Sequence, residues 1–190
     1  MKKNLLIAVC FTLVTTVIFG VVYPLAVTGL SQLLFPWKAN GELIERNGRL
    51  VGSRIIGQVF TGPQYFHSRP SNAGTGYDPT ASGGSNLAPT NKALIQRVAG
   101  DVQAVETDDP SKPVPIDLVT QSGSGLDPDI SPAAAEYQIA RVAQARQMNQ
   151  QAVREFVKRH TSGRDIGFLG EPRVNVLELN LDLDDSLNRR

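Results

Sequence analysis

The sequence predicts an α+β fold in which a single N-terminal transmembrane helix is followed by one extracytoplasmic mixed helix/sheet domain. Three observations lead to this prediction. No Asp, Glu, Lys or Arg occurs in residues 4–37. Beyond this run, segments with helical spacing and short β-type segments are mixed without strict alternation, which is typical of α+β domains. The length of 190 residues fits one membrane segment and one globular domain.

The charge-free run is long enough to cross a membrane. A helix of about 20 residues spans the hydrocarbon core, and residues 5–35 exceed that length. Lys2 and Lys3 precede the run, and such flanking positive charge stays on the cytoplasmic side. We therefore expect a cytoplasmic tail at residues 1–4, a transmembrane helix region at 5–35 and an extracytoplasmic domain at 36–190, with the chain in the inner (plasma) membrane.

Other interpretations of the N-terminus fit less well. A cleaved signal peptide has an apolar region of about 7–15 residues and a small-residue cleavage site, and this run is longer and lacks such a site. A lipoprotein modified at Cys10 is disfavoured because Val9 stands where a small residue is needed. Pro24 interrupts the helix hydrogen bonding, so we expect a kink there.

Local signals predict a hairpin and then a long irregular segment. Residues 42–51 are expected to form two strands joined at Asn47-Gly48, a pair that is favoured where both turn residues have positive φ. Residues 61–89 are rich in Gly, Pro, Ser and Asn, and the stretch is too long for an ordinary loop, which indicates a functional or disordered segment. Its aromatic residues argue against disorder.

Three helices and two further strands are expected in the rest of the domain. Thr90 or Asn91 caps the first helix, Ser131 followed by Pro132 starts the second, and the third begins near Asn149. The first helix places apolar residues on one face at helical spacing: Leu94, Ile95, Val98, Val102 and Val105. Strands are expected at residues 116–119 and 174–183, the latter with a β-bulge at Leu177.

Motifs for nucleotide hydrolysis or conduction are missing from the sequence. Residues 122–125, Ser-Gly-Ser-Gly, lack the Lys of a P-loop, and we interpret the Gly-Ser run at 82–86 as a turn rather than an anion site. Residues 74–77, Gly-Thr-Gly-Tyr, are similar to a potassium-filter sequence. A filter needs four such loops inside a membrane, so we expect an ordinary loop with a buried tyrosine.

Metal and catalytic sites are not expected either. His67 and His160 are the only histidines, and neither has the spacing of a metal ligand. The alternative is a membrane-anchored extracytoplasmic hydrolase that uses His67 with Arg69, Asp78 and a serine, but the sequence has no G-x-S-x-G motif. The formal charge of +1 becomes −1 without the two N-terminal lysines, which argues against a nucleic-acid partner.

Six segments in the same order together resemble one family, the C subunit of the bacterial Kdp potassium-transporting P-type ATPase. The resemblance covers almost the whole chain after the membrane helix. The segments are Phe35-Pro-Trp-Lys-Ala-Asn-Gly41, Ile56-Gly-Gln-Val-Phe60, Tyr65-Phe-His-Ser-Arg-Pro-Ser71, Ser82-Gly-Gly-Ser-Asn-Leu87, Ser122-Gly-Ser-Gly-Leu-Asp127 and Val174-Asn-Val-Leu-Glu-Leu-Asn-Leu181.

The resemblance implies a non-catalytic accessory subunit of an ATP-driven, high-affinity potassium uptake complex. It implies three partners: a channel-like A subunit that selects potassium, a B subunit that hydrolyses ATP, and a small F subunit in the membrane. The residues agree with an accessory role, because this chain has no Asp-Lys-Thr-Gly phosphorylation motif.

The resemblance also implies a catalytic chaperone that raises the ATP affinity of the hydrolysing subunit. It places a nucleotide contact, with ATP as the only ligand implied, at Ser122, Gly123, Ser124, Gly125, Leu126 and Gln138. ATP is cytoplasmic, whereas the N-terminal charges place this loop on the opposite side of the membrane. We therefore favour a role in assembly and in covering the entrance over direct ATP binding.

Partner contacts are expected in two places. We expect the long loop to dock against the extracellular face of the potassium-selecting subunit through Tyr65, Phe66 and Arg69, because aromatic and Arg side chains commonly anchor interfaces. The alternative is that these residues belong to the domain's own core and salt bridges. In the membrane, Gly20 and Gly29 would allow close approach of a partner helix.

Overall fold

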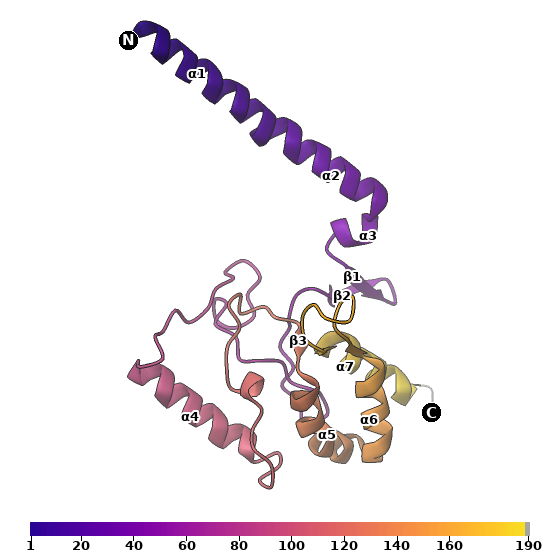
Figure 1. Cartoon of the computed structure of the whole chain (residues 1–190). Coiled ribbons are helices and arrows are strands. Elements are labelled where there is room, and N and C mark those ends of the chain that lie inside the picture. Colours follow the sequence, from indigo (N-terminus) through magenta and orange to yellow (C-terminus); the bar gives the residue numbers. More distant parts are fainter. Residues whose placement is uncertain (189–190) are drawn as a thin grey trace. The chain divides into compact units, whose positions relative to one another are not determined.

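The computed structural model describes residues 1–188 and divides the chain into two compact units, Met1–Val51 and Gly52–Arg190 (Figure 1). The first unit is mostly one apolar helix, and the second mixes helices with short strands. The predicted α+β class with an N-terminal apolar helix is confirmed. The boundaries predicted for the cytoplasmic tail, the membrane segment and the outer domain stay predictions.

One continuous helical run forms most of the first unit. It consists of α1 (Lys2–Val17), a π-helical turn (Ile18–Val22) and α2 (Tyr23–Leu34), and none of its residues is buried. The run Lys2–Leu34 is 33 residues long, and an 18-residue stretch within it has a mean hydropathy of 2.7. It is the one helix in residues 1–188 that is long and apolar enough to cross a membrane.

The π turn ends at Val22, two residues before Pro24. Proline has no N–H to donate, and a residue that widens the turn by one lets the helix continue past this defect. The N–H of Tyr23 donates to the carbonyl of Ile18, five residues earlier, as a π turn requires. The interruption of hydrogen bonding expected at Pro24 is therefore accommodated by a π turn, and the kink stays a prediction.

A short helix and a hairpin follow. α3 (Pro36–Ala39) precedes β1 (Leu43–Arg46) and β2 (Arg49–Ser53), which form a two-stranded sheet. Asn47 and Gly48 have φ values of 52° and 71°, so both turn residues are left-handed as predicted for this pair.

The core of the second unit forms between a small sheet and three helices. The sheet has the order β3-β5-β4 and is antiparallel, with Ile130 opposite Val174 and Val174 opposite Thr161. Its strands are β3 (Asp129–Ile130), β4 (Thr161–Ser162) and β5 (Arg173–Asn175). The helices are α5 (Pro132–Arg146), α6 (Gln150–Arg159) and α7 (Val176–Asn188). Buried side chains from these elements form one hydrophobic cluster.

The predicted helix starts are confirmed by their caps. The side chain of Asn91 accepts from the N–H of Ala93 at the start of α4 (Lys92–Glu106). The hydroxyl of Ser131 accepts from Ala134 at the start of α5, and Asn149 accepts from Gln151 at the start of α6. Each cap satisfies an N–H that has no partner within its own helix.

The helix α4 forms as predicted, but its apolar face is only partly covered, because Leu94, Val98 and Val102 are half-buried. None of its residues is buried, and Ile95 is largely exposed. Figure 1 shows α4 set apart from α5, α6 and α7 within the second unit. Only Val105, near its C-terminal end, packs against the core cluster.

The strand predicted at 116–119 was wrong, and the one predicted at 174–183 was confirmed only for Val174 and Asn175, in β5. Ile116–Leu118 is a 3₁₀ turn rather than part of a strand. Residues 176–183, expected to continue a bulged strand, form the first part of α7. The alternating Val and Leu residues imitate a strand, but Val176, Leu179 and Leu183 are also three and four residues apart, and all three are buried. Asn175 favours the helix because its side chain accepts from the N–H of Glu178.

Candidate functional site

The loop at residues 122–125 is held by its own hydroxyl groups. The hydroxyl of Ser122 accepts from the N–H of Gly125 at 2.9 Å, and the hydroxyl of Ser124 accepts from the N–H of Leu126 at 3.1 Å. These are local turns in which a serine replaces a backbone acceptor. The backbone N–H groups of Gly125 and Leu126 therefore already donate to hydroxyl groups of the same loop.

A second Gly-Ser segment packs against this loop. The N–H of Gly83 and the hydroxyl of Ser82 both donate to the carbonyl of Ser124, at 2.8 and 3.0 Å. The hydroxyl of Ser71 donates to the carbonyl of Gly125 at 2.6 Å. The run at 82–86, interpreted from the sequence as a turn, is thus one wall of a packed pair of loops.

Close backbone approach explains why Gly125 is a glycine. Its φ is +68°, and a Cβ atom there would lie 2.7 Å from the nitrogen of Ala73 and 2.8 Å from the carbonyl oxygen of Gly83. Gly123 differs, because a Cβ atom there would meet no heavy atom within 4 Å. Of the two glycines in this loop, one is required by packing and the other is open to solvent.

Within the described residues 1–188, no hydrogen bond connects Gln138 to the loop at 122–126. It is buried on α5, where its amide oxygen accepts from the N–H of His67 at 2.8 Å and from Arg141 at 2.7 Å. Its amide nitrogen donates to the carbonyls of His67 and Ala134. The structure therefore brings Ser122, Gly123, Ser124, Gly125 and Leu126 together, and it uses Gln138 to bind the long loop.

The long loop at 61–89 has no helix or strand, and α5 and α7 fix its first part through side chains that bond its backbone. Arg141 donates to the carbonyls of Pro63 and Tyr65, and Arg146 donates to the carbonyl of Gln64. From α7, Asn180 both donates to and accepts from the backbone of Phe66. Farther along, the hydroxyl of Tyr77, which is half-buried, donates to the carbonyl of Arg69. The loop is an integral part of the domain.

The predicted partner-contact residues of this loop all have contacts within the domain. Phe66 is fully buried in the core cluster. The hydroxyl of Tyr65 donates to Asp184 at 3.3 Å, and the guanidinium of Arg146 lies 5.2 Å from the centre of the Tyr65 ring. Arg69 forms an ion pair with Asp127 at 3.1 Å. A contact of these residues with a partner subunit stays a prediction, and Phe66 in particular serves the fold.

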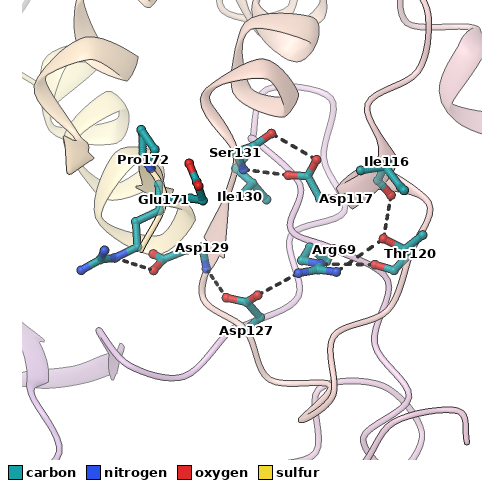
Figure 2. Close-up of a pocket in the computed structure, with 11 residues that line it drawn as sticks. Arg69, Ile116, Asp117, Thr120, Asp127, Asp129, Ile130, Ser131, Glu171 and Pro172 are labelled. Carbon is teal, nitrogen blue, oxygen red and sulfur yellow. Dashed lines mark hydrogen bonds and ion pairs between the residues drawn. The ribbon is translucent and has the colours of Figure 1, made fainter. Parts of the chain in front are cut away.

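A cavity of about 550 Å³ lies beside Arg69. Figure 2 shows Arg69 donating to Asp127 on one side and to Thr120 on the other, while Ser131 donates twice to Asp117 (Figure 2). The remaining lining side chains include Asp129, Glu171 and Arg173.

The charges of this cavity are largely paired. Arg173 lies 3.4 Å from Asp129, whose carboxylate also accepts from Asn175 at 3.1 Å. Burial raises the pKa of Asp129, and the negative charge of Asp127 adds to this shift. Among residues 1–188, no group of His, Cys, Asp and Glu side chains is arranged to hold a metal ion.

The hydrolase alternative finds no support in the position of His67. Its Nε2 lies 3.1 Å from the carbonyl oxygen of Gly62, while the carboxylate of Asp78 bonds Thr80. No hydrogen bond in residues 1–188 joins His67 to Asp78 or to a serine hydroxyl. Burial lowers the pKa of His67, and the nearby Arg141 lowers it further.

Comparison with known proteins gives a match over nearly the whole chain. The family model described as KdpC, the c chain of the K⁺-transporting ATPase, matches residues 5–185. The chain belongs to the KdpC family. The resemblance inferred from the sequence segments is therefore confirmed.

Two KdpC relatives show how close the match is. The potassium-transporting ATPase KdpC subunit of Koribacter versatilis is 61% identical over 184 residues, covering 97% of this chain and 95% of the relative. The KdpC subunit of Acidobacterium capsulatum is 56% identical over 182 residues, covering 96% of this chain and 98% of the relative.

Sequence reasoning missed the residues that hold the site together. Asn180 and Arg146 are buried polar side chains that lie on helices and reach the backbone of the long loop. For Asn180 a signal was present, because Val176, Leu179 and Leu183 surround it at helical spacing. For Arg146 the position near the end of α5 predicts only a favourable charge for the helix dipole.

Proposed function

We propose that this chain is the non-catalytic accessory subunit of an ATP-driven, high-affinity potassium uptake complex, and that it stabilises the assembly. Membership in the KdpC family and the single apolar helix support this role. The partners are a channel-like A subunit that selects potassium, an ATP-hydrolysing B subunit and a small F subunit.

The observation that carries our choice of an assembly role over direct ATP contact is the internal bonding of the loop at 122–125. A phosphate site in such a loop needs backbone N–H groups that point to solvent. Here the N–H groups of Gly83, Gly125 and Leu126 donate to atoms of the same two loops, and Gln138 is buried elsewhere. This pattern favours an effect on ATP affinity through assembly, as a catalytic chaperone, over direct contact with ATP.

Gly123 offers a way to test this choice in the assembled complex. Gly123→Gln adds a long side chain at an exposed site with free space, so the fold is expected to persist. We expect the KM for ATP of the complex to stay unchanged, while omission of the whole chain lowers recovery of the complex. A severalfold higher KM in a normally assembled Gly123→Gln complex would show direct nucleotide contact instead.

We also propose that the N-terminus is cytoplasmic and that the domain lies outside the inner membrane. Lys2 and Lys3 support this orientation. With Cys10→Ser as background, a membrane-impermeant thiol reagent should label Ser111→Cys in intact, outer-membrane-permeabilised cells and should not label Asn4→Cys. Both positions are exposed in the structure. Labelling at Asn4→Cys alone would reverse the orientation and restore access of the domain to cytoplasmic ATP.

A further inference from the structure

An exposed apolar tip projects between β4 and β5. Three large apolar side chains within four residues are mostly exposed: Ile166 at 82%, Phe168 at 70% and Leu169 at 50%. Single exposed apolar side chains are ordinary on a protein surface. A cluster of three at the end of one loop indicates a surface that becomes covered.

The tip is an ordered turn with a closed base. The N–H of Leu169 donates to the carbonyl of Asp165 at 2.9 Å, and the N–H of Asp165 donates back at 2.8 Å. Below them Arg164 forms an ion pair with Glu171 at 2.7 Å. Ile166 and Gly167 have φ values of 54° and 83°, which turn the chain sharply at the end. The apolar side chains are therefore presented by a defined structure.

The tip arises close to the place where the chain enters the second unit. Gly52 is the first residue of this unit, and two residues later the carbonyl of Arg54 accepts from the side chain of Asn175, on β5. Ile55 lines a small cavity together with Ser162 and Arg173, the residues of β4 and β5 nearest the loop. The base of the tip and the incoming chain thus share one edge of the domain.

The connection to the apolar helix is short. α2 ends at Leu34, and residues 35–51, which include the β1–β2 hairpin, separate it from Gly52. Even a fully extended chain of this length would reach only about 60 Å, and the hairpin shortens it. A domain tethered in this way stays at the bilayer surface, where even a weak contact with lipid has a high effective concentration.

We propose that the tip at residues 166–169 inserts into the interfacial region of the bilayer that the N-terminal helix crosses. Hydrocarbon requires backbone groups to be satisfied within the segment, and the N–H groups of Gly167, Phe168 and Leu169 all donate inside the loop. Phe and Leu side chains are suited to the boundary between headgroups and acyl chains. The paired Arg164 and Glu171 would remain at headgroup level.

The proposal rests on the helix crossing a membrane, and it is independent of its orientation and of any effect on ATP. The apolar side chains and the internally bonded N–H groups of the tip suit lipid, and the quenching experiment below separates lipid from a protein partner.

Tryptophan fluorescence in lipid vesicles tests this insertion. Trp37 is the only tryptophan, so Trp37→Phe removes the background and Phe168→Trp places a reporter on the tip. The full-length chain is reconstituted in phosphatidylcholine vesicles with or without bromine atoms on the acyl chains near the headgroups. Co-flotation with the vesicles reports the membrane anchor separately. We expect the brominated lipid to quench Phe168→Trp fluorescence strongly.

Gln150→Trp in the same Trp37→Phe background is the matched control. Gln150 is exposed at the start of α6, and β4 follows the other end of that helix, about 15 Å away. We expect little quenching at this position. Equal quenching at both positions, or none at Phe168→Trp in chains that float with the vesicles, would overturn the proposal. A blue-shifted but unquenched Phe168→Trp emission would place the tip on protein and would also overturn it.

Discussion

The side-chain amide of Asn180 forms two hydrogen bonds with the backbone of Phe66: its oxygen accepts from the N–H at 2.8 Å, and its nitrogen donates to the carbonyl at 2.9 Å. The two residues are 114 positions apart, and both are fully buried. This pair fixes the long loop on α7 and places the Phe66 ring in the core. Asn180 therefore acts together with Arg141, Arg146 and Gln138 in fixing the loop, and it does so from inside an apolar cluster.

Replacing Asn180 should be costly. Asn180→Leu keeps the number and branching of the side-chain heavy atoms but leaves a buried N–H and a buried carbonyl of Phe66 without partners, which costs about 1–3 kcal/mol each. We expect a clear fall in the thermal unfolding temperature of the full-length chain in detergent. Asn72→Ala is the control, since Asn72 is exposed and its side chain bonds only the carbonyl of Gly84 within residues 1–188. Equal stability of the two variants would show that the pair contributes little.

The two glycines of the serine loop should respond differently to alanine. Gly125→Ala forces a Cβ atom to within 3 Å of the Ala73 and Gly83 backbone at a left-handed φ, so we expect a loss of more than about 1 kcal/mol and a displaced loop. Gly123→Ala has free space and should be neutral. Thermal unfolding of the two variants side by side checks this, and a neutral Gly125→Ala would contradict the packing of the two loops.

His67 should make the fold sensitive to mild acid. Its pKa is lowered in the folded state, so below its ordinary value of 6.5 the unfolded chain binds the proton more strongly. This contribution to stability is complete above 6.5 and is lost as the pH falls, by at most about 1.4 kcal/mol per pH unit. His67→Gln retains a side-chain donor for the Gly62 carbonyl and should flatten the profile between about pH 7.5 and 5.5. If the free energy of unfolding falls with pH equally steeply in the original chain and in His67→Gln, His67 is not the origin of the acid sensitivity.

A buried and an exposed phenylalanine, Phe66 and Phe168, show how loss of the fold is told apart from loss of partner docking. Phe66→Ala removes a fully buried ring and should cost about 3–5 kcal/mol, so any loss of the complex follows from unfolding. Phe168→Ala changes an exposed ring and should leave the unfolding temperature unchanged. Partner docking by the long loop is then measured with Tyr65→Phe and Arg69→Gln, by co-purification of chains shown to be folded. Full recovery of the complex with both variants would argue against docking.

Substitutions at Gly20 and Gly29 test whether a partner helix packs closely against the N-terminal helix. A Cβ atom at Gly20 would meet only a methyl group of Thr16 at 3.8 Å, and one at Gly29 would meet nothing within 4 Å. Leucine therefore fits in the isolated helix, and Gly20→Leu with Gly29→Leu should weaken co-purification only where a partner helix approaches closely. Unchanged recovery would place the interface in the soluble domain.

Features that depend only on residues adjacent in the sequence were determined by the sequence alone. The charge-free run, the left-handed Asn47-Gly48 turn and the caps at Asn91, Ser131 and Asn149 each depend on local steric and hydrogen-bonding preferences. The family was also evident from the sequence, because its motifs are short contiguous segments.

Tertiary structure decided what local pattern left ambiguous. The alternating Val and Leu residues after Val174 satisfy both a strand and a helix, and burial of Leu179, Asn180 and Leu183 on one face selects the helix. Gln138 was assigned by resemblance to a nucleotide contact, whereas its amide bonds the backbone of His67 in the structure. Such bonds join residues about 70 to 114 positions apart, and no local preference encodes them. The physical reason is that a buried polar side chain acquires its role only from the partners that folding brings to it.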